Sequence, residues 1–192
     1  MASEITITAL LSFLKVGLSD QLNFPRTIFT LNGINFIHRT QLVASTDTTI
    51  DVAALTTPGL ALFINHGPST VVQLKNAAAG TIMPKLKVGE PALFRLDASV
   101  TAPVAIATAL VISAASNATA AVLTCAAHLL ITGNIVIITG FTAGWTGANG
   151  TYSVTYVGVN TFSIPVNSSG FGALSGSPVF VCSNLEYLIL ED

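Results

Sequence analysis

The sequence has very little charge. Only 8% of its 192 residues are Asp, Glu, Lys or Arg, against roughly 25% in an ordinary soluble domain. The net charge is −2 and there is no basic run, so the sequence indicates neither nucleic acid nor an anionic membrane as a partner. A surface made polar by Ser, Thr, Asn and Gly in place of charged residues costs little free energy to desolvate. This composition favours a subunit of an assembly over a free monomer.

Cysteine is scarce as well, and targeting patterns are missing. Cys125 and Cys182 are far apart and do not make a disulfide scaffold. We expect two small buried hydrophobic residues, with a disulfide between them as the alternative. The start of the chain lacks the basic and apolar regions of a secretory signal. The most apolar window, 120–138, contains Thr, His, Gly and Asn, so we expect no transmembrane helix.

Patterns that would carry catalysis or bind a metal are also missing. His38, His66 and His128 have no second His, Cys or acidic residue at metal-ligand spacing. There is no Gly-x-Ser-x-Gly elbow and no phosphate-binding loop, and the glycines between 140 and 150 are typical of turns. The pair Glu191-Asp192 is interpreted as a solvated terminus. We therefore predict no enzymatic activity, no catalytic residue, no cofactor and no metal.

Short strand patterns recur along the whole chain. Apolar and polar residues alternate in segments such as 5–8, 152–156 and 162–166, and turn residues such as Pro58-Gly59 and Gly67-Pro68 separate the runs. Alternation with a period of two and frequent turns is typical of a β-sandwich or barrel. Few segments of the sequence favour a helix, and we expect one short helix at most. The sequence predicts an all-β protein.

Charge also marks a boundary within the chain. All seven Lys and Arg lie between Lys15 and Arg95, and residues 110–185 contain no charged residue at all. The last strand pattern, 185–190, again has charged residues beside it. Insertions are best tolerated at exposed turns. We therefore predict a first domain made of residues 1–109 plus 182–192, with residues 110–181 inserted as an uncharged module.

The inserted region resembles a known module. The segments are Ala127–Gly140 (AHLLITGNIVIITG), Ala148–Thr155 (ANGTYSVT) and Asn160–Val166 (NTFSIPV). Together they resemble a small β-barrel module repeated in phage structural proteins, which is similar to the first catalytic cysteine half-domain of ubiquitin-activating enzymes. Asn134 departs from the pattern, because the phage modules usually have an acidic residue there. The resemblance covers about residues 120–181 and implies a non-catalytic barrel.

The first region resembles small virion proteins of tailed bacteriophages. The shared features are a Thr57-Pro58-Gly59 turn, a Phe63-Ile64-Asn65 strand and a final strand like 185–192. The resemblance implies a jelly-roll sandwich and a place in the virion. The expected fold is therefore all-β, a jelly-roll-like sandwich with an inserted small β-barrel module. A jelly roll alone fixes no function.

The resemblance also implies a role. We expect a capsid-associated decoration or head-fibre-type auxiliary subunit that binds other virion proteins by shape and apolar burial. The alternative is a tail or baseplate appendage with a receptor- or glycan-binding role. A homo-oligomer is expected, and the resemblance favours a trimer. We expect the first domain to dock and the module to project, with the opposite orientation left open.

One residue is singled out as a candidate contact. Trp145 is the only tryptophan and lies in the glycine-flanked loop Ala143–Gly147 of the uncharged region. It is interpreted either as a lid on the core of the module or as an exposed contact with a neighbouring subunit or a host surface. The second interpretation rests on the enrichment of tryptophan in binding hot spots.

Overall fold

The computed structural model shows an all-β protein, as predicted. The residues it describes are 3–7, 10–15, 18–23, 27–31, 33–68, 70–78, 80–97, 100 and 103–192, with side chains described from residue 33 onward. They form four four-stranded antiparallel sheets and two two-stranded ribbons. Within these residues the single helix is the short 3-10 helix η1 (Ala143–Ala148). No helix among them is long and apolar enough to cross a membrane.

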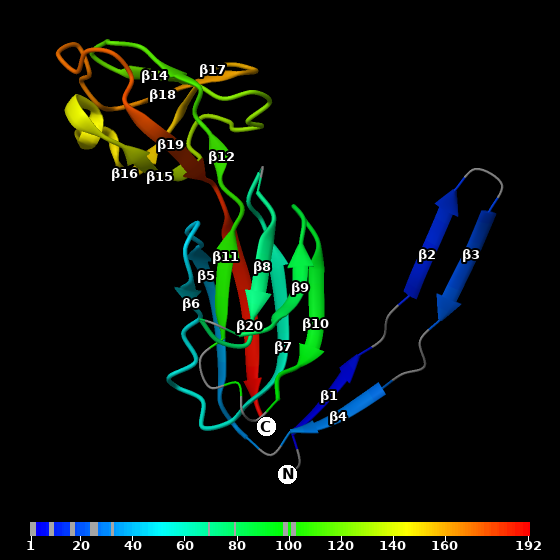
Figure 1. The fold of residues 1–192 in the computed structure, drawn as a ribbon. Coiled ribbons are helices and arrows are strands. Elements are labelled where there is room, and N and C mark those ends of the chain that lie inside the picture. Colours follow the sequence, from blue (N-terminus) through cyan, green and yellow to red (C-terminus); the bar gives the residue numbers. More distant parts are fainter. Residues whose placement is uncertain are drawn as a thin grey trace.

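Two of the sheets form a jelly roll (Figure 1). One has the order β10-β7-β20-β5 and the other the order β6-β11-β8-β9. If the eight strands are renumbered 1 to 8 in chain order, the two sheets have the strand orders 6-3-8-1 and 2-7-4-5. This is the arrangement of two Greek keys in a jelly roll. The strands are β5 (Phe36–Leu42), β6 (Thr48–Thr49), β7 (Pro58–Asn65), β8 (Val72–Lys75), β9 (Ile82–Leu86), β10 (Pro91–Arg95), β11 (Val104–Ala107) and β20 (Asn184–Glu191).

The core of the jelly roll lies between these two sheets. Successive side chains of a strand point to opposite faces, so Leu185, Tyr187 and Ile189 of β20 all enter the core, where each is at most 1% exposed. The Phe63 ring of β7 packs beside the Tyr187 ring, with centroids 6.1 Å apart. The facing sheet contributes Val72 of β8 and its neighbours to the same cluster. Burying one such large apolar side chain stabilises the fold by roughly 1.5–3 kcal/mol.

A second pair of sheets is inserted between β11 and β20. Their orders are β12-β19-β15-β16 and β13-β14-β18-β17, and they enclose a hydrophobic cluster of their own. The strands are β12 (Leu110–Val111), β13 (Ala114–Ala115), β14 (Ala121–Thr124), β15 (Ile135–Phe141), β16 (Gly150–Ser153), β17 (Thr155–Gly158), β18 (Thr161–Ile164) and β19 (Gly176–Val181). In Figure 1 this unit, called the module below, lies beyond one end of the jelly roll.

The expected barrel is not closed. The chain turns from one sheet of the module to the other at Val154, whose N–H and C=O bond to Asn134 and Gly133 and not to a neighbouring strand. At the opposite edge β12 and β13 are two residues long each. Strands this short cannot supply the continuous staggered ladder that closure requires. The module is therefore a two-sheet sandwich, and the prediction of a barrel was wrong in this respect.

The apolar run 135–138 lies where the module meets the jelly roll. Val136 and Ile138 enter the core of the module, whereas Ile137 packs against the core of the jelly roll. Ile137 pairs with Val181 of β19, which also belongs to the jelly-roll core. This strand is apolar on both faces because each face meets a different hydrophobic cluster.

A buried amide fixes the same junction. Asn65, at the end of β7, is fully buried. Its Nδ2 donates to the carbonyl oxygens of Thr70 (2.7 Å) and Leu86 (3.1 Å). Its Oδ1 accepts from the N–H of Gly67 (3.0 Å) and from the hydroxyl of Ser183 (3.2 Å), just before β20. All the hydrogen-bonding capacity of the amide is used, as a buried polar group requires.

The strands before residue 33 stand outside both pairs of sheets. Strand β1 (Ser3–Ile7) pairs with β4 (Thr27–Leu31), and β2 (Leu10–Lys15) pairs with β3 (Leu18–Asn23). The predicted jelly-roll range began at residue 1, whereas the two sheets begin at β5. Figure 1 shows the two ribbons in blue beside the jelly roll.

Because the two cores are separate, we expect the jelly roll to fold without the module. Deletion of residues 110–180 keeps Val181, the residue of β19 that belongs to the jelly-roll core. With a short Gly-Ser linker in place of the module, circular dichroism should show a β-rich protein with a cooperative thermal transition. An unfolded spectrum would show that the two units depend on each other. In the full chain, the fluorescence of Trp145 gives an independent report on the module, since this single tryptophan lies in its core.

Candidate interaction surface

Trp145 is a core residue of the module. It lies on η1 and is 0% exposed. Its ring stacks on Phe141 with centroids 5.3 Å apart and meets the edge of Phe171 at 5.2 Å. Its Nε1 donates to the carbonyl oxygen of Gly172 at 3.2 Å. Because no part of the side chain reaches the surface, Trp145 fits the interpretation as a core residue and not the alternative of an exposed contact.

The two cysteines do not pair with each other. Cys125 and Cys182 are both free and buried, as expected for small apolar residues. Burial raises the pKa of the Cys182 thiol to about 11, and it also raises the pKa of Cys125. Neither thiol is therefore ionised near neutral pH, and neither is a reactive nucleophile.

Two histidines meet one carboxylate on the surface of the jelly roll. The Nε2 atom of His38, on β5, lies 2.8 Å from Oε1 of Glu186 on β20. The Nε2 atom of His66, just after β7, lies 2.6 Å from the other carboxylate oxygen. Hydrogen bonds from His38, and then from His66, hold the pKa of the Glu186 carboxyl below its ordinary value of 4.5. Sequence spacing missed this cluster, because the pairing of β20 with β5 and β7 assembles it.

Among the described residues, no group of three or more His, Cys, Asp or Glu is placed to hold a metal ion. Several carboxylates already have cationic partners, namely Asp47 with Lys75, Asp51 with Arg39, and Asp192 with Arg95. These pairs occupy charges that a catalytic or anion-binding site would need.

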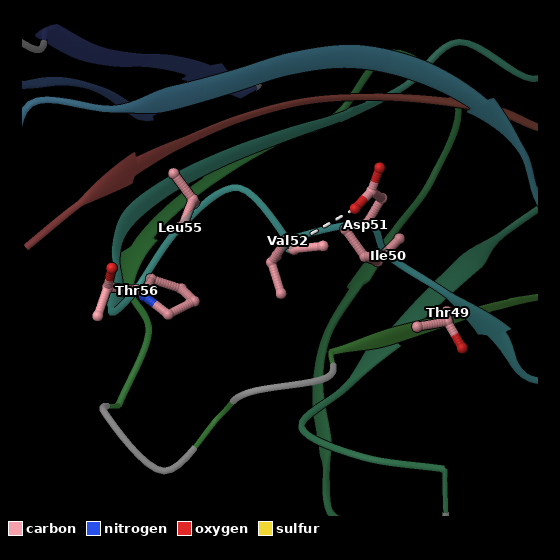
Figure 2. A pocket seen from close by; sticks show the side chains of 8 residues that line it. Thr49, Ile50, Asp51, Val52, Leu55 and Thr56 are labelled. Carbon is pink, nitrogen blue, oxygen red and sulfur yellow. Dashed lines mark hydrogen bonds between the residues drawn. The ribbon is translucent and has the colours of Figure 1, made fainter.

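A small hollow opens beside the segment between β6 and β7 (Figure 2). It measures about 260 Å³, and its lining is mostly apolar, with Ile50, Val52 and Leu55 among the residues that form it. Its only charged lining residue, Asp51, pairs with Arg39 and accepts the N–H of Ala53 at 3.1 Å. Ligand sites normally combine an apolar wall with several convergent polar groups. The polar residues in the lining are Thr49, Asp51 and Thr56, and the Asp51 carboxylate and the Thr56 N–H are already bonded to other parts of the jelly roll. The hollow is therefore a weak candidate for a ligand site.

The outer face of the sheet β10-β7-β20-β5 carries apolar residues beside the cluster of His38, His66 and Glu186. Leu188 of β20 lies between His38 of β5 and Leu62 of β7, and Leu62 pairs in turn with Leu93 of β10. Phe36 pairs with Leu190 in another row. Phe36 is 65% exposed and Leu93 is 47% exposed. We call this surface the apolar face; its residues are Phe36, Leu62, Ile64, Leu93, Leu188 and Leu190.

The outer face of the other jelly-roll sheet is different. Val72 and Leu74 of β8 point into the core, so the residues between and after them, Gln73 and Lys75, point outward. Gln73 pairs with Lys85 of β9. Antiparallel sheets with one solvated face normally show this alternation of apolar and polar residues. The apolar face breaks the pattern, and exposed contiguous apolar surface of this kind marks interaction sites.

Glu191 ties the end of β20 to the loops around it. The residue is 6% exposed. Its Oε1 accepts a hydrogen bond from the N–H of Thr56 at 2.8 Å. Its Oε2 accepts hydrogen bonds from the N–H of Ile34 (3.2 Å), the N–H of Asn35 (3.3 Å) and the side-chain Nδ2 of Asn35 (2.9 Å). The interpretation of Glu191-Asp192 as a solvated terminus was wrong, because Glu191 is buried and Asp192 pairs with Arg95.

We call the Glu191 side chain and its hydrogen bonds to Ile34, Asn35 and Thr56 the Glu191 clamp. This clamp leaves no room for a side chain at residue 33. A Cβ atom added at Gly33 would lie 2.2 Å from Cγ of Glu191. Hydrogen bonds from the N–H of Thr56 first, and then from that of Asn35, lower the pKa of the Glu191 carboxyl below its ordinary value of 4.5. The carboxylate thus stabilises the start of β5 and the approach to β7 together.

Comparison with protein-family models and with curated proteins finds no match to this chain.

We expect Glu191→Gln to lower the thermal midpoint by several degrees near neutral pH. A Gln amide has one oxygen acceptor, whereas the carboxylate uses both oxygens. Because the pKa of Glu191 is lower in the folded chain, its contribution is complete above the unfolded value and is lost as the pH falls through the folded value. Midpoints measured from pH 7 to pH 3 should therefore fall less steeply in the variant than in the wild type. Glu90→Gln, at an exposed carboxyl, is the matched control; equal pH slopes for wild type and Glu191→Gln would contradict the clamp.

Proposed function

We propose that the protein is a structural subunit of a tailed-bacteriophage virion, of the capsid-associated decoration or head-fibre type. The observation that carries the proposal is the apolar face on a jelly roll that is otherwise regular. The choice of a phage virion as the assembly rests on the resemblance of both regions to phage virion proteins. A non-enzymatic docking role fits a chain in which the described carboxylates serve structural contacts.

The chemistry of the apolar face supports docking by apolar burial. Three of the four members of its central row, Leu188, Leu62 and Leu93, are leucines, and the fourth, His38, is already hydrogen-bonded to Glu186. The charged groups beside it are already paired, with Glu186 held by two histidines and Arg95 paired with Asp192. Covering such a surface costs little, because long flexible side chains need not be ordered at its centre.

The proposed partners are other virion proteins and further copies of this chain. With a net charge of −2, electrostatic repulsion between copies is weak. Three of the seven basic residues, Arg39, Lys75 and Arg95, are paired with carboxylates in the jelly roll. This pairing supports a partner other than nucleic acid. The trimer rests on the resemblance alone.

The proposal is tested by a pair of matched substitutions. Leu93→Lys places a charge on the apolar face, and Ile82→Lys places the same charge on β9 of the other sheet. The two residues are equally exposed, at 47% and 49%. We expect Leu93→Lys to weaken binding at least tenfold in co-sedimentation with phage particles assembled without this chain, and Ile82→Lys to bind like the wild type. Circular dichroism should show that both variants are folded.

Three other results would contradict parts of the proposal. Equal binding by the two variants would exclude the apolar face as the docking surface. Failure of the wild-type chain to bind any particle would contradict the virion role. Saturation at few copies per particle would favour the tail or baseplate appendage over a subunit that covers the capsid lattice.

A further inference from the structure

A second hollow opens on the outer face of the sheet β10-β7-β20-β5. It measures about 210 Å³, and its lining includes Leu62, Ile64 and Leu188 together with His38 and Glu186. Glu186 and Leu188 alternate on β20, and their partners on β7, Ile64 and Leu62, alternate in the same way, so these side chains lie on one face of the sheet. We call it the Glu186 hollow. Pockets for drug-sized ligands measure about 300–1,000 Å³, so this smaller hollow suits a single side chain.

Two histidines hold the carboxylate of this hollow in a fixed orientation. An ionised carboxylate only accepts hydrogen bonds, so His38 donates from Nε2 to Oε1 of Glu186 at 2.8 Å, and His66 donates from Nε2 to Oε2 at 2.6 Å. His38 lies on β5 and His66 follows β7, so Glu186 is held from both neighbouring strands. A carboxylate has about four acceptor positions, and the two rings use two of them. The carboxylate is therefore oriented and can still accept from a further donor.

Neutral histidines do not cancel the charge of Glu186. Histidine side chains change charge between pH 5 and pH 8, so at pH 8 the cluster carries the single negative charge of its carboxylate. Asp47, Asp51 and Asp192 of the jelly roll each pair with a lysine or an arginine, whereas the partners of Glu186 are histidines. Of these four carboxylates, Glu186 is the one whose partners carry no permanent positive charge.

This charge constrains the chemistry of a partner on the apolar face. A partner that covers Leu62 and Leu188 also takes the Glu186 side chain, which is 32% exposed in the free protein, out of water. Removing a carboxylate from water is unfavourable unless an opposite charge and new hydrogen bonds replace the water. A partner that docks tightly here therefore has to bring a positive group to this position.

We infer that the Glu186 hollow binds a cationic side chain of the docking partner, a lysine or an arginine. Both side chains have an aliphatic stem and a charged end, and the stem readily lies along apolar surface. In the hollow, the stem packs on Leu62, Ile64 and Leu188, and the ammonium or guanidinium group donates to the remaining acceptor positions of Glu186. The presence of a partner rests on the proposed function, whereas the preference of the hollow for a cation rests on its own lining.

Small mimics of the two side chains test the hollow in the full-length protein alone. n-Butylammonium and n-propylguanidinium are the lysine and arginine side chains without their backbone, and n-butanol has the same butyl stem without a charge. In NMR titrations at pH 8 and low ionic strength, we expect both cations to shift the methyl signals of Leu62, Ile64 and Leu188 with several-fold higher affinity than n-butanol. Glu186→Gln should lower the affinity for the cations to that of n-butanol. Glu90→Gln removes the same charge from an exposed carboxyl outside the lining and should bind like the wild type.

The particle-binding assay tests the same carboxylate in the docked state. We expect Glu186→Gln to weaken co-sedimentation with phage particles at least about tenfold, because the desolvated cation of the partner loses its counter-charge, and Glu90→Gln to dock like the wild type. Unchanged or tighter docking of Glu186→Gln would overturn the inference, as would cations that bind no better than n-butanol. Cation binding by a wild-type chain that docks on no particle would contradict the proposed function alone. Circular dichroism should show that both variants are folded.

Proton uptake by the histidines is the competing source of positive charge, and it predicts the opposite pH dependence. The neighbouring charged side chains are Arg95, paired with Asp192, and the exposed Lys87 and Glu90 of the turn before β10; side chains of these types do not ordinarily titrate between pH 6 and pH 8. We expect docking to weaken from pH 8 to pH 6, because protonated histidines compete with the cation of the partner for Glu186. Docking that becomes tighter over this range would show that His38 and His66 supply the charge themselves and would overturn the inference.

Discussion

The structure depends on the pairing of one strand, β20, with both β5 and β7. This strand is the last of the chain and pairs with both neighbours along most of its length. It brings Leu185, Tyr187 and Ile189 into the jelly-roll core, and its end carries the Glu191 clamp. Because the partners of β20 lie more than a hundred residues earlier in the chain, its pairing is a long-range contact. Asn65 secures the point where the chain leaves the module and enters β20.

The same strand links the core to the proposed docking surface. Its inward residues make the core, and its outward residues Leu188 and Leu190 make part of the apolar face. A strand with apolar residues on both sides is a risk for a free monomer, because exposed apolar sheet surface promotes aggregation. In a subunit of an assembly the same feature stabilises the contact. The low charge of the whole chain is consistent with a protein that is covered on several sides when it functions.

Much of the architecture could be predicted from the sequence, and the failures have physical causes. The loss and return of charge indicated the insertion, and the strand pattern at 185–190 indicated the last strand. Closure of a barrel depends on how long the edge strands are, and the two-residue strands β12 and β13 leave no clear sequence pattern. The cluster of His38, His66 and Glu186 depends on strand register across three distant segments. The apolar face did leave a signal, because the continuous apolar run at 60–64 is typical of a strand covered on both faces, yet a sequence alone does not say what covers it.

Hydrogen exchange on the native, full-length protein tests the central role of β20 most directly. Amides in the middle of β20, β5 and β7 should exchange as one group, at the free energy of unfolding of the jelly roll. Amides of β15, β18 and β19 should form a second group with a different dependence on denaturant. Glu191→Gln should accelerate exchange in the first group and leave the second unchanged. Exchange of β20 together with β19 and the module, independently of β5 and β7, would contradict the account.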